Sequence, residues 1–200
     1  VAIAGAGTVA NSGKIIGTSG AGLSIGNGGT LTNAAGATIT GTSFGAAITG
    51  ARGTVTNSGS ITATGTSGIG VELGAGGTVT NNADAVIQGK KDGIWAPGGS
   101  TKVSNAGSIT GTAGHGILIG GPGQLTNSTG PTITGASGVV SSGAGTVANS
   151  GKIIGTSGSG LSIGNGGTLT NAARATITGT SFGAPITGAR GTVTNFGSIR

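Results

Sequence analysis

The chain has 200 residues, of which 49 are glycine and only 6% are charged, and it contains no cysteine. Three acidic residues, one histidine and four aromatic residues offer little material for a catalytic site, and a disulfide or thiolate metal site is impossible. The glycines do not follow a three-residue period, which excludes collagen, and the regular recurrence of Val, Ile and Leu argues against disorder.

A motif of the form [Val/Leu]-x-Asn recurs along the whole chain. Its asparagines are 22 or 24 residues apart, and an Ile follows each of them alternately four and six residues later. A third apolar cluster, with the two-residue spacing of a strand, follows in most repeats, as at Leu23 and Ile25. The asparagines are Asn11, Asn33, Asn57, Asn81, Asn105, Asn127, Asn149, Asn171 and Asn195.

Each repeat therefore predicts three short strands separated by turns of Gly, Ser and Asn, with no segment suited to a helix. One repeat cannot bury its apolar face alone, whereas stacked repeats can. The sequence predicts an all-β, three-sided parallel β-solenoid of about nine coils of 22–24 residues, filling residues 1–200 as a single segment. At ~4.8 Å between stacked strands, the rod would be roughly 43 Å long.

Strand alternation predicts which side chains enter the core. In residues 53–57, Val55 points inward and Thr54 and Thr56 point outward. Asn57 shares the inward side at the corner, where its amide can bond to the asparagines above and below it. The nine asparagines therefore predict a buried ladder, and this is compatible with a simple role as turn residues.

The sequence also contains a second, longer repeat made of several coils. Residues 5–61 recur as residues 143–199, at a shift of 138 positions, or six coils. Only four of the 57 pairs differ: Ala21/Ser159, Gly36/Arg174, Ala47/Pro185 and Ser58/Phe196. We expect all four to face outward, because a core tolerates less change. We also expect the chain to be part of a longer array.

The run GTVTNSGSITATGTSGIGVELGAGGTVTN, from Gly53 to Asn81, resembles the passenger regions of bacterial autotransporters and related secreted adhesins. The resemblance extends over essentially all 200 residues. It implies a right-handed parallel β-helix exported to the surface of a Gram-negative cell, where it serves as a stalk or adhesive fibre. It carries no catalytic or binding residues over to this chain, because the matching positions are structural.

Catalytic and metal chemistry is not expected. The acids Glu72, Asp84 and Asp92 fall one per coil at most, and none is predicted to have a partner one coil away, so we expect no enzyme. Glu72 is expected to point to solvent. His115, in a Gly-His-Gly segment, is predicted to be a solvated turn residue without an acidic neighbour. No cofactor site is predicted.

The net charge of +6 raises the possibility of a polyanionic partner. The basic residues are sparse, however, and no aromatic residues interleave with them, so specific nucleic-acid binding is not expected. Solvated charge is the favoured interpretation, with weak attraction to an anionic polysaccharide as the alternative. The apolar runs, such as residues 116–119, are too short to span a membrane.

Trp95 is the only tryptophan and lies close to Lys90 and Lys91. Because Ile94 is predicted to point inward, the indole should lie outside, where it can stack on a sugar. It can equally cover an irregularity in its own coil. Trp95, Lys90 and Lys91 are therefore the candidate surface contact.

Thr-x-Thr pairs predict two parallel rows of threonine on one flat face, resembling those of ice-binding proteins. The rows are interrupted by Lys102, Gln124, Ala10 and Ala148. Threonine is also simply a good strand residue. We therefore expect an extracellular structural or adhesive stalk, with two alternatives: a filament subunit that associates end to end or side by side, and an ice-binding solenoid.

Overall fold

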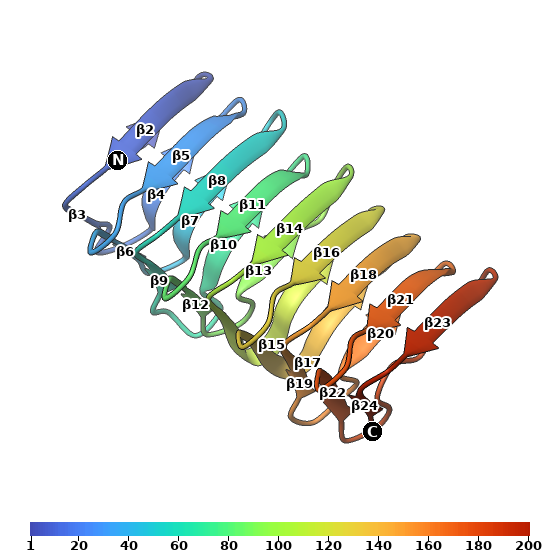
Figure 1. The fold of residues 1–200 in the computed structure, drawn as a ribbon. Coiled ribbons are helices and arrows are strands. Elements are labelled where there is room, and N and C mark those ends of the chain that lie inside the picture. The colour runs from blue at the N-terminus through green and yellow to red at the C-terminus, as the bar shows by residue number, and fades with distance from the viewer.

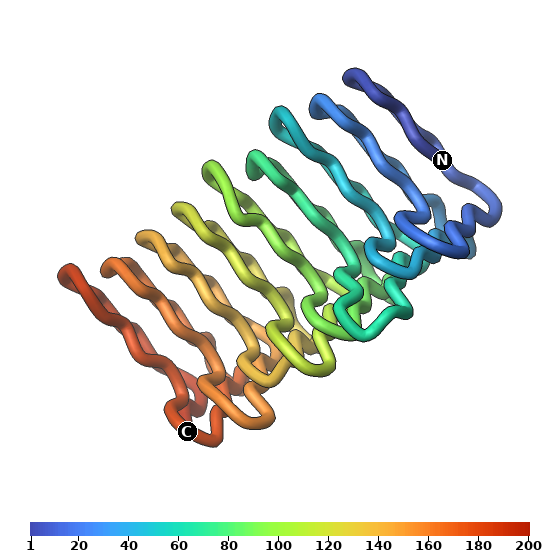
Figure 2. Tube along the Cα trace, turned by 180° about the vertical axis from the view of Figure 1, so that it is seen from behind, coloured from blue at the N-terminus to red at the C-terminus, as the bar shows by residue number.

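The computed structural model describes all residues from 1 to 200 as a stack of β-coils without a helix (Figure 1). Successive coils lie side by side along one axis from the N-terminus to the C-terminus (Figure 2). The predicted parallel β-solenoid of about nine coils is therefore confirmed. The chain has no helix of the length and apolarity needed to cross a membrane.

The [Val/Leu]-x-Asn segments form one parallel sheet of nine strands, here called the first sheet. Each strand pairs with its neighbour in the same register, so that Asn57 lies beside Asn81, and Val55 beside Val79. In order, the strands are β2 (Gly7–Asn11), β5 (Gly29–Asn33), β8 (Gly53–Asn57), β11 (Gly77–Asn81), β14 (Thr101–Asn105), β16 (Gly123–Asn127), β18 (Gly145–Asn149), β21 (Gly167–Asn171) and β23 (Gly191–Asn195).

The second and third strands of the coils form a second sheet of 15 strands. The second strands are β3 (Lys14–Ile16), β6 (Thr38–Gly41), β9 (Ser60–Ala63), β12 (Val86–Gly89), β19 (Lys152–Gly155), β22 (Thr176–Gly179) and β24 (Ser198–Ile199). The third strands are β1 (Ala2–Ile3), β4 (Ala21–Ile25), β7 (Phe44–Ile48), β10 (Ile69–Leu73), β13 (Ile94–Ala96) and β20 (Leu161–Ile163). Two long strands, β15 (Ser108–Ile119) and β17 (Thr132–Ser141), serve as both in their coils.

The prediction of three separate short strands per coil is wrong for β15 and β17. In β17 only two residues separate Gly135 from Gly138, the shortest connection at this corner, and the chain stays extended through it. β15 contains two more residues in this corner than β17. It accommodates them by a shift in register between Gly111 and His115.

The coils share one core. A single cluster of 27 buried apolar side chains runs through the stack, including Val55, Ile61 and Val71, none of which is exposed. Thr54 is exposed and Thr56 half-buried, as strand alternation predicts. Because the core is continuous, each coil depends on its neighbours to cover its apolar side chains.

A row of glycines brings the second and third strands close together. A Cβ at Gly70 would lie 2.6 Å from the carbonyl oxygen of Gly93 and 2.8 Å from Cγ2 of Ile87, so a larger residue does not fit there. The row comprises Gly22, Gly45, Gly70, Gly93, Gly116, Gly138, Gly160 and Gly183. This close approach accounts for part of the high glycine content, which composition alone did not explain.

Most of the positions that differ between the two copies of the long repeat are accessible to solvent, as expected. Gly36, Arg174 and Phe196 are exposed, and most of the others are half-buried. Ala47 is the exception, because only 4% of it is exposed. It lies between Ser24 and Glu72 in register, and these longer side chains stand on both sides of its methyl group.

Candidate ligand-binding groove

The nine asparagines form the complete ladder that their spacing predicts. The Nδ2 group of each asparagine donates to Oδ1 of the next, at 2.8–2.9 Å, in eight successive bonds. Asn57 Nδ2 also lies 3.0 Å from the carbonyl oxygen of Val86 and 3.1 Å from that of Gly59. The ladder therefore ties the end of each first-sheet strand to the next coil and supplies partners for buried polar groups.

The structure brings together two of the three candidate contact residues. Trp95 is half-buried while Ile94 is fully buried, in agreement with the predicted alternation. Lys91 Nζ lies 5.9 Å from the centroid of the Trp95 ring, a cation–π distance. Lys90 is exposed, and its side chain joins no ion pair or hydrogen bond, although its carbonyl oxygen accepts from the N–H of Ala113.

Glu72 lies beside Trp95, a neighbour that the sequence analysis missed. The two residues are paired in register between β10 and β13. Glu72 alternates with the buried Val71 and Leu73, in agreement with the predicted outward direction, but it is half-buried, and this burial raises the pKa of its carboxyl group. The side chains of neighbouring coils thus shield a residue that its own strand directs outward.

His115 is not the isolated solvated residue that was predicted. It lies within β15, and its Nδ1 atom is 2.8 Å from Oδ1 of Asp92. The same carboxylate oxygen accepts the backbone N–H of His115 at 2.7 Å. The expectation that no acid has a partner one coil away is therefore also wrong. The two positions are 23 residues apart, which is one coil, and this spacing was the signal available in the sequence.

Asp92 has no exposed surface, and its Oδ2 atom has no partner. Burial by itself raises the pKa of Asp92, but the side-chain and backbone hydrogen bonds from His115 oppose it. With the positive charges of His115 and Lys91, they bring the pKa below its ordinary value. His115 is paired in register with Ser137, but no hydrogen bond joins their side chains. The Asp92–His115 pair therefore fastens two adjacent corners together, without a nucleophile bonded to the imidazole.

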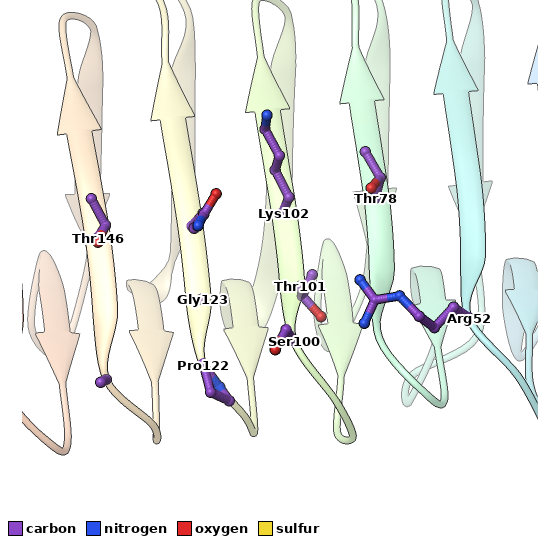
Figure 3. A pocket seen from close by; sticks show the side chains of 10 residues that line it. Arg52, Thr78, Ser100, Thr101, Lys102, Pro122, Gly123 and Thr146 are labelled. Atoms are coloured by element: carbon purple, nitrogen blue, oxygen red, sulfur yellow. The ribbon is translucent and has the colours of Figure 1, made fainter.

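A hollow lined by two cationic side chains lies on the outer face of the first sheet (Figure 3). This groove, of about 450 Å³, crosses the strands from the turn before β8 to β18. Its polar side chains include Arg52, Thr78, Lys102, Gln124 and Thr146, and its other lining residues are Ser100, Thr101, Pro122, Gly123 and Ala144. None of the lining residues is acidic.

Register explains why the groove forms where it does. Thr54, Thr78, Lys102, Gln124 and Thr146 occupy the same position on five successive strands. The two residues that interrupt this threonine row in the sequence are therefore direct neighbours in the groove. Figure 3 shows the Lys102 side chain running along β14 and the Arg52 guanidinium group pointing from its turn toward the start of β11, the strand between them.

Thr101 lines the groove but belongs to the core. Its position in the first sheet is occupied by glycine on the other eight strands, where a Cβ would meet either backbone of the preceding strand, as at Gly77, or core side chains, such as Leu73 and Ile48 at Gly53. In its own coil the small Ala96 stands where Leu73 stands in the coil before. Thr101 fills the space that Ala96 leaves, is 2% exposed, and keeps an Oγ1 atom without a partner.

Comparisons with protein-family models, curated proteins and solved structures found no match to this chain.

Proposed function

We propose that this chain is a rigid spacer in the stalk of an extracellular bacterial surface protein. One observation carries the proposal: the first sheet keeps a single register across all nine strands, with the asparagine ladder along its edge. A spacer needs a shape that is maintained over its whole length, and identical bonds between every pair of coils supply it. The resemblance to adhesin passenger regions supports the extracellular location.

The mechanical argument follows from the bonding between coils. Each coil is joined to the next by parallel strand pairs on its walls, by the shared apolar core and by one buried Asn–Asn bond. Bending the stack would lengthen these bonds on one side and leave buried polar groups without partners, which costs free energy. Adding coils therefore increases length without changing cross-section. One 138-residue block of six coils would add ~29 Å.

Self-assembly into filaments is the structural alternative. Any solenoid has strands at its two ends whose backbone groups are free to pair with another copy. Negative-stain electron microscopy of the purified, concentrated segment separates the two functions. The spacer proposal predicts discrete short rods, whereas long filaments one solenoid wide would replace it with a self-assembling polymer.

Ice binding is a second candidate, favoured by the threonine rows. Thr54, Thr78 and their neighbours are in strict register on the outer face of the first sheet. Lys102 and Gln124 interrupt that face near its middle, and the groove lies there, which favours the spacer over an ice surface. Thermal hysteresis in a concentrated solution tests the candidate directly, and its absence would remove ice binding.

A further inference from the structure

We propose that the groove on the first sheet binds an extended acidic polysaccharide. The inference goes beyond the spacer function and does not depend on it. The groove has two cationic side chains, Arg52 and Lys102, and no acidic residue among those that line it. Its remaining polar groups are hydroxyls and an amide, which suit the hydroxyl groups of sugars.

The positions of the two cations fit a linear ligand. Arg52 precedes β8 and Lys102 lies on β14, with only β11 between them in the sheet. Two strand intervals separate their backbones by roughly 10 Å along the rod axis, and the Lys102 side chain extends along β14, across that axis (Figure 3). A chain lying along the rod can therefore place one anionic group on the guanidinium and another on the ammonium. The guanidinium can hold a carboxylate or sulfate through two hydrogen bonds.

The uncharged residues favour a sugar chain over a nucleic acid. Thr78, Gln124 and Thr146 face the groove beside the cations, and the lining contains no aromatic residue on which a base can stack. Thr101 is not assigned a contact with the ligand, because its hydroxyl is buried in the core. Both cations are exposed, so binding requires no buried charge.

Titration of a fluorescently labelled polyuronate oligomer, followed by anisotropy at physiological salt, tests the proposal. Dextran sulfate distinguishes carboxylate from sulfate recognition, and neutral dextran tests the need for charge. We expect saturable binding to at least one acidic glycan and none to neutral dextran. The variant carrying both Arg52→Ala and Lys102→Thr should bind at least roughly tenfold more weakly.

The chain supplies matched controls for this experiment. Arg190 occupies the position of Arg52 in the second copy of the long repeat and does not line the groove, and Lys152 is an exposed lysine on the second sheet. The variant carrying both Arg190→Ala and Lys152→Ala has the same net charge as the groove variant and should keep the parental affinity. Lys102→Thr introduces the residue that Thr78 already supplies in the same row, so the fold should be preserved, as circular dichroism can verify.

Several results would overturn the proposal. Equal weakening in the groove and control variants would attribute binding to overall charge rather than to the groove. Loss of binding in Trp95→Ala, with the groove variant unaffected, would move the site to the Lys91–Trp95 corner. Tighter binding of a single-stranded oligonucleotide than of any glycan, or no binding to either acidic glycan, would also contradict it. None of these results bears on the length or stiffness of the rod.

Discussion

Residues 5–61 and 143–199 are almost the same sequence, yet the structure treats one segment of the two copies differently. In the first copy, Phe44–Ile48 forms β7 within the second sheet. In the second copy the equivalent residues 182–186 form no strand, although the carbonyl oxygens of Gly183 and Pro185 still accept from the N–H groups of Leu161 and Ile163, and an isolated bridge joins Ile163 to Ile186. Pro185 replaces Ala47 there and lacks the N–H that a sheet strand needs. Pairing thus differs locally between the copies while the first sheet keeps its register.

In the longer turn, where Ile follows Asn by six residues, a substitution between the copies leaves the backbone conformation unchanged. Gly36 has a positive φ of 76°, and Arg174, its equivalent in the second copy, has a φ of 68°. Asp84 adopts the same left-handed conformation in another coil, at 61°. The bonds on both sides therefore set the shape of this turn, and a non-glycine residue is held there at a conformational cost.

The largest effect is expected from exchanging the residues that differ in strand β7. Ala47→Pro should lower the free energy of unfolding by about 3 kcal/mol, because proline has no N–H to donate to the strand ladder. Along the same edge of the chain, the N–H of Thr49 donates to the carbonyl oxygen of Ile25 in the preceding coil. Pro185→Ala should allow strand pairing of residues 182–186. Hydrogen exchange of the backbone amides measures both, and unchanged protection in Ala47→Pro would contradict the explanation of the difference between the copies.

The second-largest effect is expected from breaking the asparagine ladder. Asn57→Ala should lower the free energy of unfolding by about 2–3 kcal/mol, because the buried amides of Asn33 and Asn81 each lose a partner. Asn195 is the equivalent residue in the second copy and has a neighbouring asparagine on one side only. Asn195→Ala should therefore cost less than half as much in chemical denaturation. Equal losses would show that the ladder adds nothing beyond the individual turns.

Acidic pH should destabilise the coils between the two copies of the long repeat before it destabilises the copies. The three acidic side chains, Glu72, Asp84 and Asp92, all lie outside residues 5–61 and 143–199. Because the pKa of Asp92 is lower in the folded chain than in the unfolded one, its stabilisation is present above the unfolded pKa. It is lost as the pH falls through the folded pKa.

Protection factors, which express amide exchange relative to its intrinsic rate at each pH, should therefore fall at acidic pH for residues 89–93 and 111–116 of the parent, before those of the two copies fall. Asp92→Asn should have lower protection in these corners at neutral pH and a weaker dependence on acid. The same pH dependence in Asp92→Asn as in the parent would show that Asp92 does not fasten the corners.

The smallest effect is expected at the left-handed turn. Arg174→Gly should raise the free energy of unfolding by up to about 1 kcal/mol, because glycine adopts a positive φ without strain. The reverse change, Gly36→Arg, should lower it by a similar amount in the first copy. Thermal denaturation of the two variants measures both changes in stability. Changes of the same sign would show that backbone strain does not control this position.

The sequence was sufficient to predict the coil, its three strands, its inward residues and the asparagine ladder, because all of these repeat. It was less informative wherever two different coils meet. The Asp92–His115 pair, the shielding of Glu72 and the groove around Lys102 each depend on register between coils of unequal length. Only the Asp92–His115 pair has a signal in the sequence, because the two residues are 23 positions, or one coil, apart.

The fused strands β15 and β17 were beyond the sequence analysis for a different reason. The corner of β15 has four residues between Gly111 and Gly116, as many as lie between Gly155 and Gly160, where β19 and β20 remain separate strands, so neither composition nor length identifies a fused corner. Thr101 shows the same limit in the core. A threonine replaces glycine without disturbing the first sheet, because Ala96 is small in the same coil.

Small-angle X-ray scattering of the chain and of a variant lacking residues 58–105 tests the central claim most directly. The deletion joins Asn57 to Ala106, removes two coils and preserves the alternation of short and long turns. We predict that the longest dimension falls by roughly 10 Å while the cross-sectional radius stays constant. A changed cross-section, or an unfolded scattering profile, would contradict the account of a spacer whose length is the sum of identical coils.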